Sequence, residues 1–290
     1  MIRFADQNTS IEVRRMWKTC FNDPDEFLDI YFHEKYKNEN TLLWIEDGQV
    51  VASIQILPYI FTFCNIEIPV GYISGACTLP EYRNRGYMSK LLLASFDVMR
   101  QRNIPLSVLI PAEDWLYGYY AGYGYERVFD SGEKIVPLKE IYEQTNKDID
   151  VAYQNFDILF RKRDFCVQKS KKDFITIIKD AILYGFPSSY NVAGMARIID
   201  AELLLSYFAK TYPDKFFICK IDDKHIEMNN FTFEIKNGSF IQLTEHLHKE
   251  TSININTLCR LLFGYHLDEF PDIFAKNFVP HEPVMNLMLE

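Results

Sequence analysis

Residues 73–88 read ISGACTLPEYRNRGYM. The apolar start of this segment predicts a strand, which ends at Pro80. A short loop with Arg83, Arg85 and Gly86 follows, and a long amphipathic helix begins at the next residue. A strand that leads into a helix N-terminus directs several backbone amides to one point, where the helix dipole favours an anion. This order predicts a phosphate site, in which Gly86 lets the backbone approach closely and the two arginines add charge.

The flanking sequence extends this pattern in both directions. Before the segment, the hydrophobic spacing predicts amphipathic helices over residues 11–20 and 24–36, then strands over 41–46, 49–57, 59–64, 66–70 and 71–79. After it, the spacing predicts a helix over 87–102, a strand over 105–110, a helix over 112–121 and a strand over 125–129. These elements predict an α+β or α/β fold, with a mixed, mostly antiparallel sheet flanked by helices.

The second half of the chain is less regular. Residues 138–181 mix helical and charged segments, and the basic clusters at 161–163 and 169–172 are expected to be solvated faces. Further along, the pattern predicts a helix over 196–210, a strand over 216–221, a hairpin over 230–235 and 240–243, and a helix over 256–263. The 290 residues favour two domains. We expect a first domain over 1–130, a linking region over 131–190 and a C-terminal domain over 191–290.

Composition narrows the classes of function. The formal net charge is −9, which argues against binding to a nucleic-acid backbone and is compatible with a cationic acceptor. Six cysteines are widely scattered, without CxxC pairs or histidine clusters, so no metal is expected. No apolar segment is long enough to span a membrane. We therefore expect a cytoplasmic protein with reduced thiols and with neither a membrane nor a nucleic-acid partner.

Two separate runs together resemble the GNAT acetyltransferases. Residues 78–92, TLPEYRNRGYMSKLL, resemble the acetyl-CoA loop R/Q-x-x-G-x-G/A at the start of the third helix of that superfamily. Residues 119–128, YYAGYGYERV, resemble its FYxxxGFxxx ending. The last small residue of the loop pattern is replaced here by Met88. The resemblance covers about residues 1–130 and implies direct transfer of an acetyl group from acetyl-CoA to an amine in a ternary complex.

The resemblance also assigns roles to individual residues. Backbone groups of Ala76, Cys77 and Thr78 would hold the pantetheine arm, and Tyr120 would be the general acid. The diphosphate would be held by the loop and the first helical turn: Arg83, Asn84, Arg85, Gly86, Tyr87, Met88 and Ser89. Tyr120 could instead be a packed aromatic among its tyrosine neighbours. For Cys77, which has no evident activating base nearby in the sequence, a structural role is favoured over a nucleophilic one.

The later sequence is similar to the Eis-type (enhanced intracellular survival) branch of the superfamily. Residues 195–200, MARIID, and 261–265, LLFGY, are similar to parts of its sterol-carrier-protein-like C-terminal domain. Such chains insert a second GNAT-like domain, for which residues 131–190 are too few, so homo-oligomer formation stays open. In that branch the terminal carboxylate reaches the active site, which implies the α-carboxylate of Glu290 as the base. Glu113 is the next candidate, followed by His33 and Glu26.

Three alternatives stay open at this level. The predicted phosphate loop could be a strand, turn and helix without a ligand. The chain could be a non-catalytic acyl-CoA-binding protein, or its C-terminal module could bind a lipid. The acceptor is defined only as a small amine or a lysine-containing partner.

Overall fold

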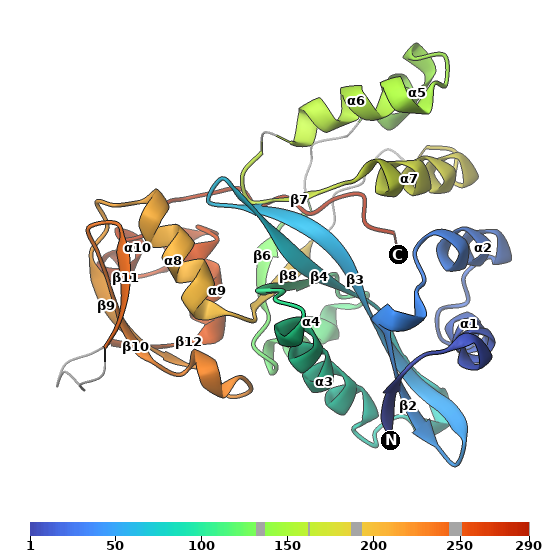
Figure 1. Cartoon of the computed structure of the whole chain (residues 1–290), viewed down its shortest axis with the longest axis horizontal. Coiled ribbons are helices and arrows are strands. Elements are labelled where there is room, and N and C mark those ends of the chain that lie inside the picture. The colour runs from blue at the N-terminus through green and yellow to red at the C-terminus, as the bar shows by residue number, and fades with distance from the viewer. Residues whose placement is uncertain (132–136, 162, 187–192, 244–250, 290) are drawn as a thin grey trace.

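The computed structural model describes residues 1–131, 137–161, 163–186, 193–243 and 251–289. Within these ranges, eight strands form a large sheet in the order β1-β2-β3-β4-β5-β8-β6, with β7 paired to β3 (Figure 1). The strands are β1 (Ile2–Phe4), β2 (Thr41–Glu46), β3 (Gln49–Phe63), β4 (Ile66–Thr78), β5 (Leu106–Leu109), β6 (Glu126–Phe129), β7 (Cys166–Gln168) and β8 (Gly194–Ile198). The β4–β5 pair is parallel and the other pairs are antiparallel, which confirms the predicted mixed sheet.

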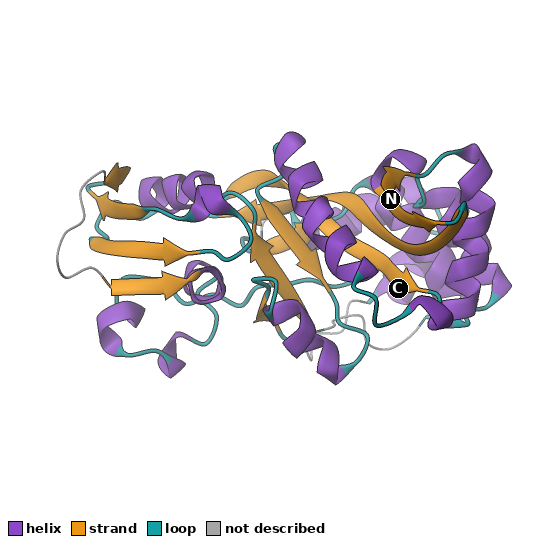
Figure 2. Cartoon of the chain, turned by 90° about the horizontal axis from the view of Figure 1, so that it is seen from below, coloured by secondary structure: helices purple, strands orange, loops and turns teal. Residues whose placement is uncertain are grey.

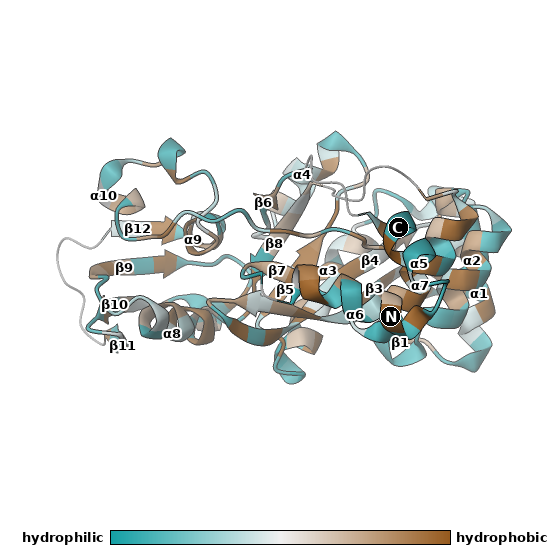
Figure 3. Cartoon of the chain, turned by 90° about the horizontal axis from the view of Figure 1, so that it is seen from above, coloured by the Kyte–Doolittle hydropathy of each residue, from teal (hydrophilic) through white to brown (hydrophobic). Residues whose placement is uncertain are grey.

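Helices cover both faces of this sheet. The helices are α1 (Gln7–Phe21), α2 (Asp25–Glu34), α3 (Tyr87–Gln101), α4 (Asp114–Ala121), α5 (Leu138–Gln144), α6 (Ile149–Phe160) and α7 (Lys171–Leu183). Side chains alternate along β3, so that Ile54 and Ile56 face α3 while Leu57 and Tyr59 belong to the core on the other side. Helices α1, α2, α5, α6 and α7 gather at one end of the molecule (Figure 3). We call the side covered by α3 the α3 face, and the other side the α7 face.

A smaller sheet lies beside the large one, at the other end of the molecule (Figure 2). Its order is β11-β10-β9-β12, formed by β9 (Phe217–Asp222), β10 (Thr232–Lys236), β11 (Ser239–Leu243) and β12 (Thr251–Asn254). It is accompanied by α8 (Ala201–Thr211), α9 (Ile255–Leu262) and α10 (Asp272–Ala275). Short 3₁₀ helices are η1 (Asn38–Asn40), η2 (Pro80–Tyr82), η3 (Glu227–Asn229) and η4 (Leu267–Glu269). We refer to residues 199–283 as the C-terminal module.

Several sequence predictions need correction. The strands predicted to break near residues 58 and 71 are continuous, as β3 and β4. Pro58 is tolerated because it lies between the pairing of β3 with β2, which ends at Gln55, and the pairing with β7, which begins at Ile60. Pro24 occupies the N-cap of α2 rather than its first turn.

The helix predicted over 196–210 begins only at Ala201, and residues before it form β8 instead. Asp200 is the N-cap of α8, and its carboxylate accepts a hydrogen bond from the amide of Leu203. β8 lies between β5 and β6, so the large sheet extends across the expected boundary at residue 190. All five residues of β8 are buried, which fits a strand that is covered on both faces, and its one charged residue is Arg197.

Among the described residues, no helix is both long and apolar enough to cross a lipid bilayer.

Candidate active site

The strands β4 and β5 part at one end of the sheet. Their pairing ends where Ile73 lies beside Leu109, although β4 continues to Thr78. Just beyond this point β4 bulges against β3, and Gly75 lies in the bulge with a φ of +56°. A Cβ on Gly75 would lie 2.2 Å from the Trp17 ring, so this position requires glycine. Among the described residues, the last residues of β4 therefore have a strand partner on one edge only.

The residues predicted to hold the pantetheine arm, Ala76, Cys77 and Thr78, are these last residues of β4. The amide of Leu79 donates to the carbonyl of Val51 on β3, at 3.0 Å. Backbone groups alternate in direction along a strand, so the amide of Thr78 points to the opposite, open edge. In the described structure, the edge of β4 beyond Ile73 that faces away from β3 therefore has no strand partner.

The loop before α3 has the geometry of an anion site. Gly86 is the N-cap of α3 with a φ of +75°, and its side chain position has no atom within 4 Å. Asn84 is also in the left-handed region, with a φ of +61°. Within the part of the chain that the structure describes, no side chain caps α3, so the amides of Tyr87, Met88 and Ser89 have no capping acceptor there. Met88 packs against the core of the α3 face, which keeps its side chain away from these amides.

The two loop arginines already have partners. Arg83 Nε donates to the carbonyl of Thr78 at 3.2 Å. Arg85 lies 3.5 Å from the carboxylate of Glu46, which also accepts a hydrogen bond from the Tyr87 hydroxyl. Both arginines are exposed. Glu46 was not predicted from the sequence, and a diphosphate at this loop would compete with it for Arg85.

Cys77 is buried beside Cys20 of α1. The Cys77 Sγ lies 3.6 Å from Ser53 Oγ, and the hydrogen bond with Cys20 together with burial raises the pKa of Cys77. The same hydrogen bond and the nearby Arg83 guanidinium lower the pKa of the half-buried Cys20 thiol to about 7. Within the described ranges, no group of His, Cys, Asp and Glu could hold a metal ion.

Tyr120 lies on α4 beside the parted strands. Its ring packs in the same core as Ile73, Leu109 and Met195, and meets the Tyr125 ring edge-on at 5.8 Å. The side chain is 7% exposed, and burial raises the pKa of its hydroxyl to about 12. The described residues include no hydrogen-bond partner for this hydroxyl. Tyr120 is therefore a protonated donor at the end of the sheet where the predicted thioester would lie.

The C-terminal module holds the end of α4 in place. Asn256 Nδ2 donates to the carbonyls of Ala121 and Tyr125, at 3.1 and 2.7 Å, and the ring of His225 lies 2.8 Å from the Gly122 carbonyl. His225 also stacks on Tyr123 at 5.3 Å. These contacts join residues more than 100 positions apart in the sequence, and they fix the backbone on both sides of the helix end.

A buried ion pair reinforces this junction. Arg197 of β8 donates to both carboxylate oxygens of Asp223 at 2.8 Å, and neither side chain is exposed. Asn229 also donates to Asp223, at 2.8 Å. Gly124 has a φ of +87°, and a Cβ there would lie 2.7 Å from Arg197 Nε. The turn after α4 therefore requires glycine at position 124, because Arg197 lies against it.

The chain's end is docked on the α7 face as far as it is described. The amide of Val284 donates to the carbonyl of Phe165 at 2.8 Å, and the carbonyl of Val284 accepts from the amide of Val167 at 3.0 Å. Met285 packs closely on Gly194 of β8: a Cβ added to Gly194 would lie 2.1 Å from the methionine methyl group. The carbonyl of Leu109, at the end of β5, is next to this contact. Leu289 is buried. Glu290, the predicted base, lies outside the described residues.

The other candidate bases lie on the surface. Glu113 is exposed at the N-cap of α4 and accepts a hydrogen bond from Trp115 at 2.9 Å. Glu26 and His33 are also exposed. Sequence reasoning missed Asp180 of α7, where burial raises the carboxyl pKa to about 6 and Oδ1 has no hydrogen-bond partner in the described structure. Asp180 lies in an ordinary amphipathic helix pattern, which does not distinguish it as a candidate base.

Comparison with known proteins identifies the first domain. Residues 1–128 match the family of acetyltransferase (GNAT) domains. No protein of curated function matches the sequence. A conserved protein of Enterococcus faecalis V583, described as a probable N-acyltransferase, superposes with a TM-score of 0.68 at 14% identity, over 99% of this chain and 98% of that one.

Two further structures show the same fold over nearly the whole chain. A GCN5-related N-acetyltransferase of Anabaena variabilis superposes with a TM-score of 0.61 at 16% identity, over 97% of this chain and 94% of that one. Eis1 of Mycobacterium abscessus does so with a TM-score of 0.59 at 10% identity, over 98% and 96%. At these identities the likeness concerns the fold. The match over residues 1–128 supports a GNAT acetyltransferase domain in this part of the chain.

Proposed function

We propose that the chain transfers the acetyl group of acetyl-CoA directly to an amine in a ternary complex. The observation that carries this proposal is the open edge of β4 beside the uncapped N-terminus of α3, with Tyr120 at the same end of the sheet. A strand edge can pair with the amides of a pantetheine arm, and an uncapped helix N-terminus can bind a diphosphate. Both parts of one cosubstrate would then find partners on neighbouring elements.

In this proposal, Ala76, Cys77 and Thr78 hold the pantetheine arm, and the amides of residues 84–89 hold the diphosphate. Arg83 and Arg85 contribute charge from the loop, Arg85 after leaving Glu46. Met88 would leave room for the diphosphate, because its partly buried side chain packs against the core of the α3 face. The carbonyl of the thioester gains negative charge as the amine attacks, and a strand amide can stabilise it.

Tyr120 would act on the leaving thiolate. A hydroxyl with a pKa of about 12 is a much weaker acid than an ordinary thiol with a pKa of about 8.5. Complete proton transfer to the thiolate would therefore be unfavourable. Hydrogen-bond donation to the sulfur as its charge develops is the role that fits this environment, with the proton passed on later.

The base that takes the proton from the amine is proposed to be the α-carboxylate of Glu290. The docked course of residues 284–289 supports this, because it carries the chain past the end of β5 and onto the α7 face. An amine with a pKa near 10 is mostly protonated at neutral pH, so a nearby carboxylate would also help to bind it. Asp180 is the second candidate for this role.

The Eis-type assignment and the sterol-carrier-protein-like nature of the C-terminal domain are part of the same proposal, and the superposition on Eis1 is consistent with them. Aromatic side chains fill the interior of the C-terminal module: Phe208, Phe217 and Phe278 contact one another, as do Phe231, Phe233 and Phe240. Such packing favours a scaffold over a lipid carrier. In this proposal the C-terminal module positions Tyr120, because Asn256 and His225 hold the end of α4.

Calorimetry with CoA and thiol-release assays with a panel of amines test the proposal. We expect CoA to bind, and acetyl-CoA to release free thiol in the presence of at least one amine. Binding without turnover on any amine would instead support the non-catalytic acyl-CoA-binding alternative. The absence of any heat of CoA binding would contradict both.

A further inference from the structure

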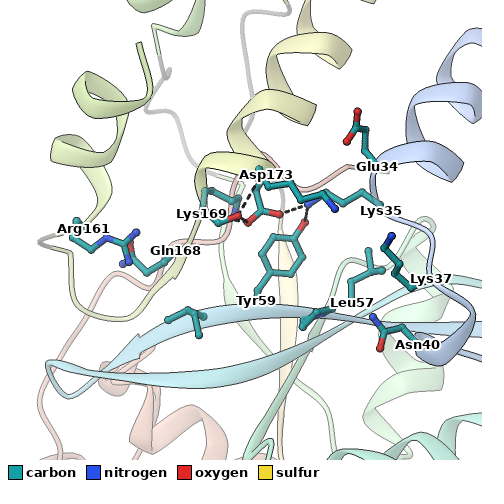
Figure 4. A pocket seen from close by; sticks show the side chains of 14 residues that line it. Glu34, Lys35, Lys37, Asn40, Leu57, Tyr59, Arg161, Gln168, Lys169 and Asp173 are labelled. Carbon is teal, nitrogen blue, oxygen red and sulfur yellow. Dashed lines mark hydrogen bonds and ion pairs between the residues drawn. The ribbon is translucent and has the colours of Figure 1, made fainter. Parts of the chain in front are cut away.

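A cavity of 340 Å³ lies on the α7 face of the large sheet, away from the loop that precedes α3. Its walls come from the end of α2, the middle of β3, the segment from β7 into α7, and Arg161 (Figure 4). These segments are far apart in the sequence. The cavity therefore forms only when the chain folds, and no sequence motif predicts it.

The cavity is basic in a protein of net charge −9. Five of its lining side chains are basic and two are carboxylates. The carboxylates are already paired, Asp173 with Lys35 and Glu34 with Lys179. The ion pairs among the described residues include none for Lys37, Lys169 or Lys172. Uncompensated positive charge thus remains at this site, and the N-terminus of α7 adds to it.

Lys169 is the most unusual member of this group. Its side chain is 1% exposed, and its ammonium has weak partners: the Val167 carbonyl at 3.4 Å and the Met288 sulfur at 3.2 Å. It also lies over the Tyr59 ring at 5.2 Å. A buried charge without a counter-ion is costly, and burial lowers the pKa of Lys169 to about 8. An anion in the cavity would remove this cost.

The cavity is near the parted strands. Leu57 in its wall pairs with Tyr72 of β4, and Ser74, two residues further, stands where β4 leaves β5. Leu57 and Ser74 are therefore separated by about 7 Å along β4 and about 5 Å between β4 and β3. The intervening surface is polar: the Tyr31 hydroxyl bonds to Ser74 at 2.9 Å and to Gln55 at 3.1 Å.

Two buried polar atoms in the same region lack partners. The hydroxyl of Tyr72 and Nε2 of Gln55 have no hydrogen bond in the described structure. Buried polar groups are nearly always satisfied, so such atoms call for an explanation, for example an ordered water or a ligand. Together with Tyr59, they make a polar strip from the cavity toward the end of β4.

We propose that this cavity binds the anionic group of the acceptor, a carboxylate or a phosphate, with Lys169 as its counter-ion. The proposal rests on the proposed acetyl transfer and narrows the acceptor to amines that also carry an anionic group. Such a molecule would place its anion beside Lys169 and its amine near the parted strands. A small polycationic amine would be a poor acceptor, because the cavity would repel it.

Calorimetry with matched amines tests this site. The probes are 5-aminopentanoate, O-phosphoethanolamine and pentylamine, which carry a carboxylate, a phosphate and no anion, together with inorganic phosphate alone. We expect one of the two anionic amines to bind at least about tenfold more tightly than pentylamine. The stronger of the two identifies the preferred anion. Equal affinities for all three amines would overturn the proposal.

Variants locate the binding. Lys169→Met should reduce the preference for the anionic amine by about tenfold or more, while Lys210→Met, an exposed lysine on α8, should not change it. Lys172→Met at the exposed rim of the cavity should reduce it about two- to threefold, without disturbing a buried side chain. Unchanged anion preference in Lys169→Met would contradict the proposal. Lys169-dependent binding without thiol release would support the anion site and count against acetyl transfer.

Discussion

The two faces of the large sheet are assembled from the chain in different ways. On the α3 face, the loop, α3, β5 and α4 follow one another between Leu79 and Ala121. On the α7 face, the cavity combines α2, β3, β7 and α7, and the chain's end at Met288 reaches it through Lys169. One face is thus a continuous segment of sequence, while the other is put together from four or five separate segments.

A site formed by one continuous segment can be predicted from the sequence more easily than a site formed by distant segments. A continuous segment keeps the order of its elements, so a glycine before an amphipathic helix predicts an anion site directly. A face assembled from distant segments has no such order. If the proposals are right, the α3 face binds the cosubstrate and the α7 face binds the acceptor. Changes on the two faces should then affect different kinetic constants.

The largest effect is expected on the α7 face and concerns stability. The pKa of Lys169 is lowered to about 8 from 10.5, so between these values the unfolded chain binds more protons, and the folded state gains stability as pH rises. The difference in unfolding free energy between wild type and Lys169→Met should change by up to about 3 kcal/mol between pH 7.5 and pH 10.5. Below pH 8 the methionine variant should be the more stable one.

Chemical denaturation across this pH range measures the effect. Asp173, Lys35, Tyr59 and Cys166 face Lys169 and are present in both proteins, so that their contributions largely cancel in the difference. Lys210→Met serves as the control for removal of an exposed lysine. Parallel curves for wild type and Lys169→Met would show that the lysine is not buried as described.

The second prediction concerns the chain's end. Adding one glycine after Glu290 moves the terminal carboxylate while leaving Met285, Leu287 and Leu289 in their buried positions. If this carboxylate is the base, kcat should fall by about a hundredfold with little change in acetyl-CoA affinity. Deleting residues 288–290 should do the same, at some cost in stability. Normal turnover of both variants would exclude the terminus and make Asp180→Asn the next variant to measure.

The fold of the first 130 residues was largely predictable, for a physical reason. Hydrophobic periodicity is a local signal, and it predicted α1, α3, β2 and the first part of β3. The second half of β8 was assigned to a helix because a short buried strand and a buried helix segment cannot be told apart by periodicity alone. Its pairing partners lie about 70 and 90 residues away along the chain, beyond the reach of any local pattern.

The site divides in the same way. Gly86 and Tyr120 could be proposed from the sequence because each belongs to a run of neighbouring residues. Lys169 was expected to lie on a solvated basic face and is instead buried, since Tyr59 and the chain's end cover it. Asn256 carried no signal at all, because its two carbonyl partners lie more than 100 residues away.

The third prediction concerns Tyr120 of α4, which packs in the core of the α3 face. Tyr120→Phe should lower kcat by at least about tenfold, because a hydrogen bond to the developing thiolate is lost. Acetyl-CoA affinity should stay nearly constant, since the hydroxyl has no partner in the described structure whose loss would disturb the fold. Tyr117→Phe, on the same helix, is the matched control. Equal turnover of the two variants would remove Tyr120 from the mechanism.

The smallest effect is expected on the α3 face, and two glycines provide the comparison. Gly86 and Gly48 have φ values of +75° and +81°, and neither has an atom within 4 Å of its side chain position. Replacing either by alanine should cost a similar 1–2 kcal/mol in stability, roughly, because both are in the left-handed region. Only Gly86→Ala changes the loop that presents the amides of α3. Calorimetry should therefore show CoA affinity reduced about fivefold, or about 1 kcal/mol, in Gly86→Ala and unchanged in Gly48→Ala. Because strain is matched, equal losses in both variants would mean that the effect reflects stability, and the assignment of the diphosphate to this loop would fail.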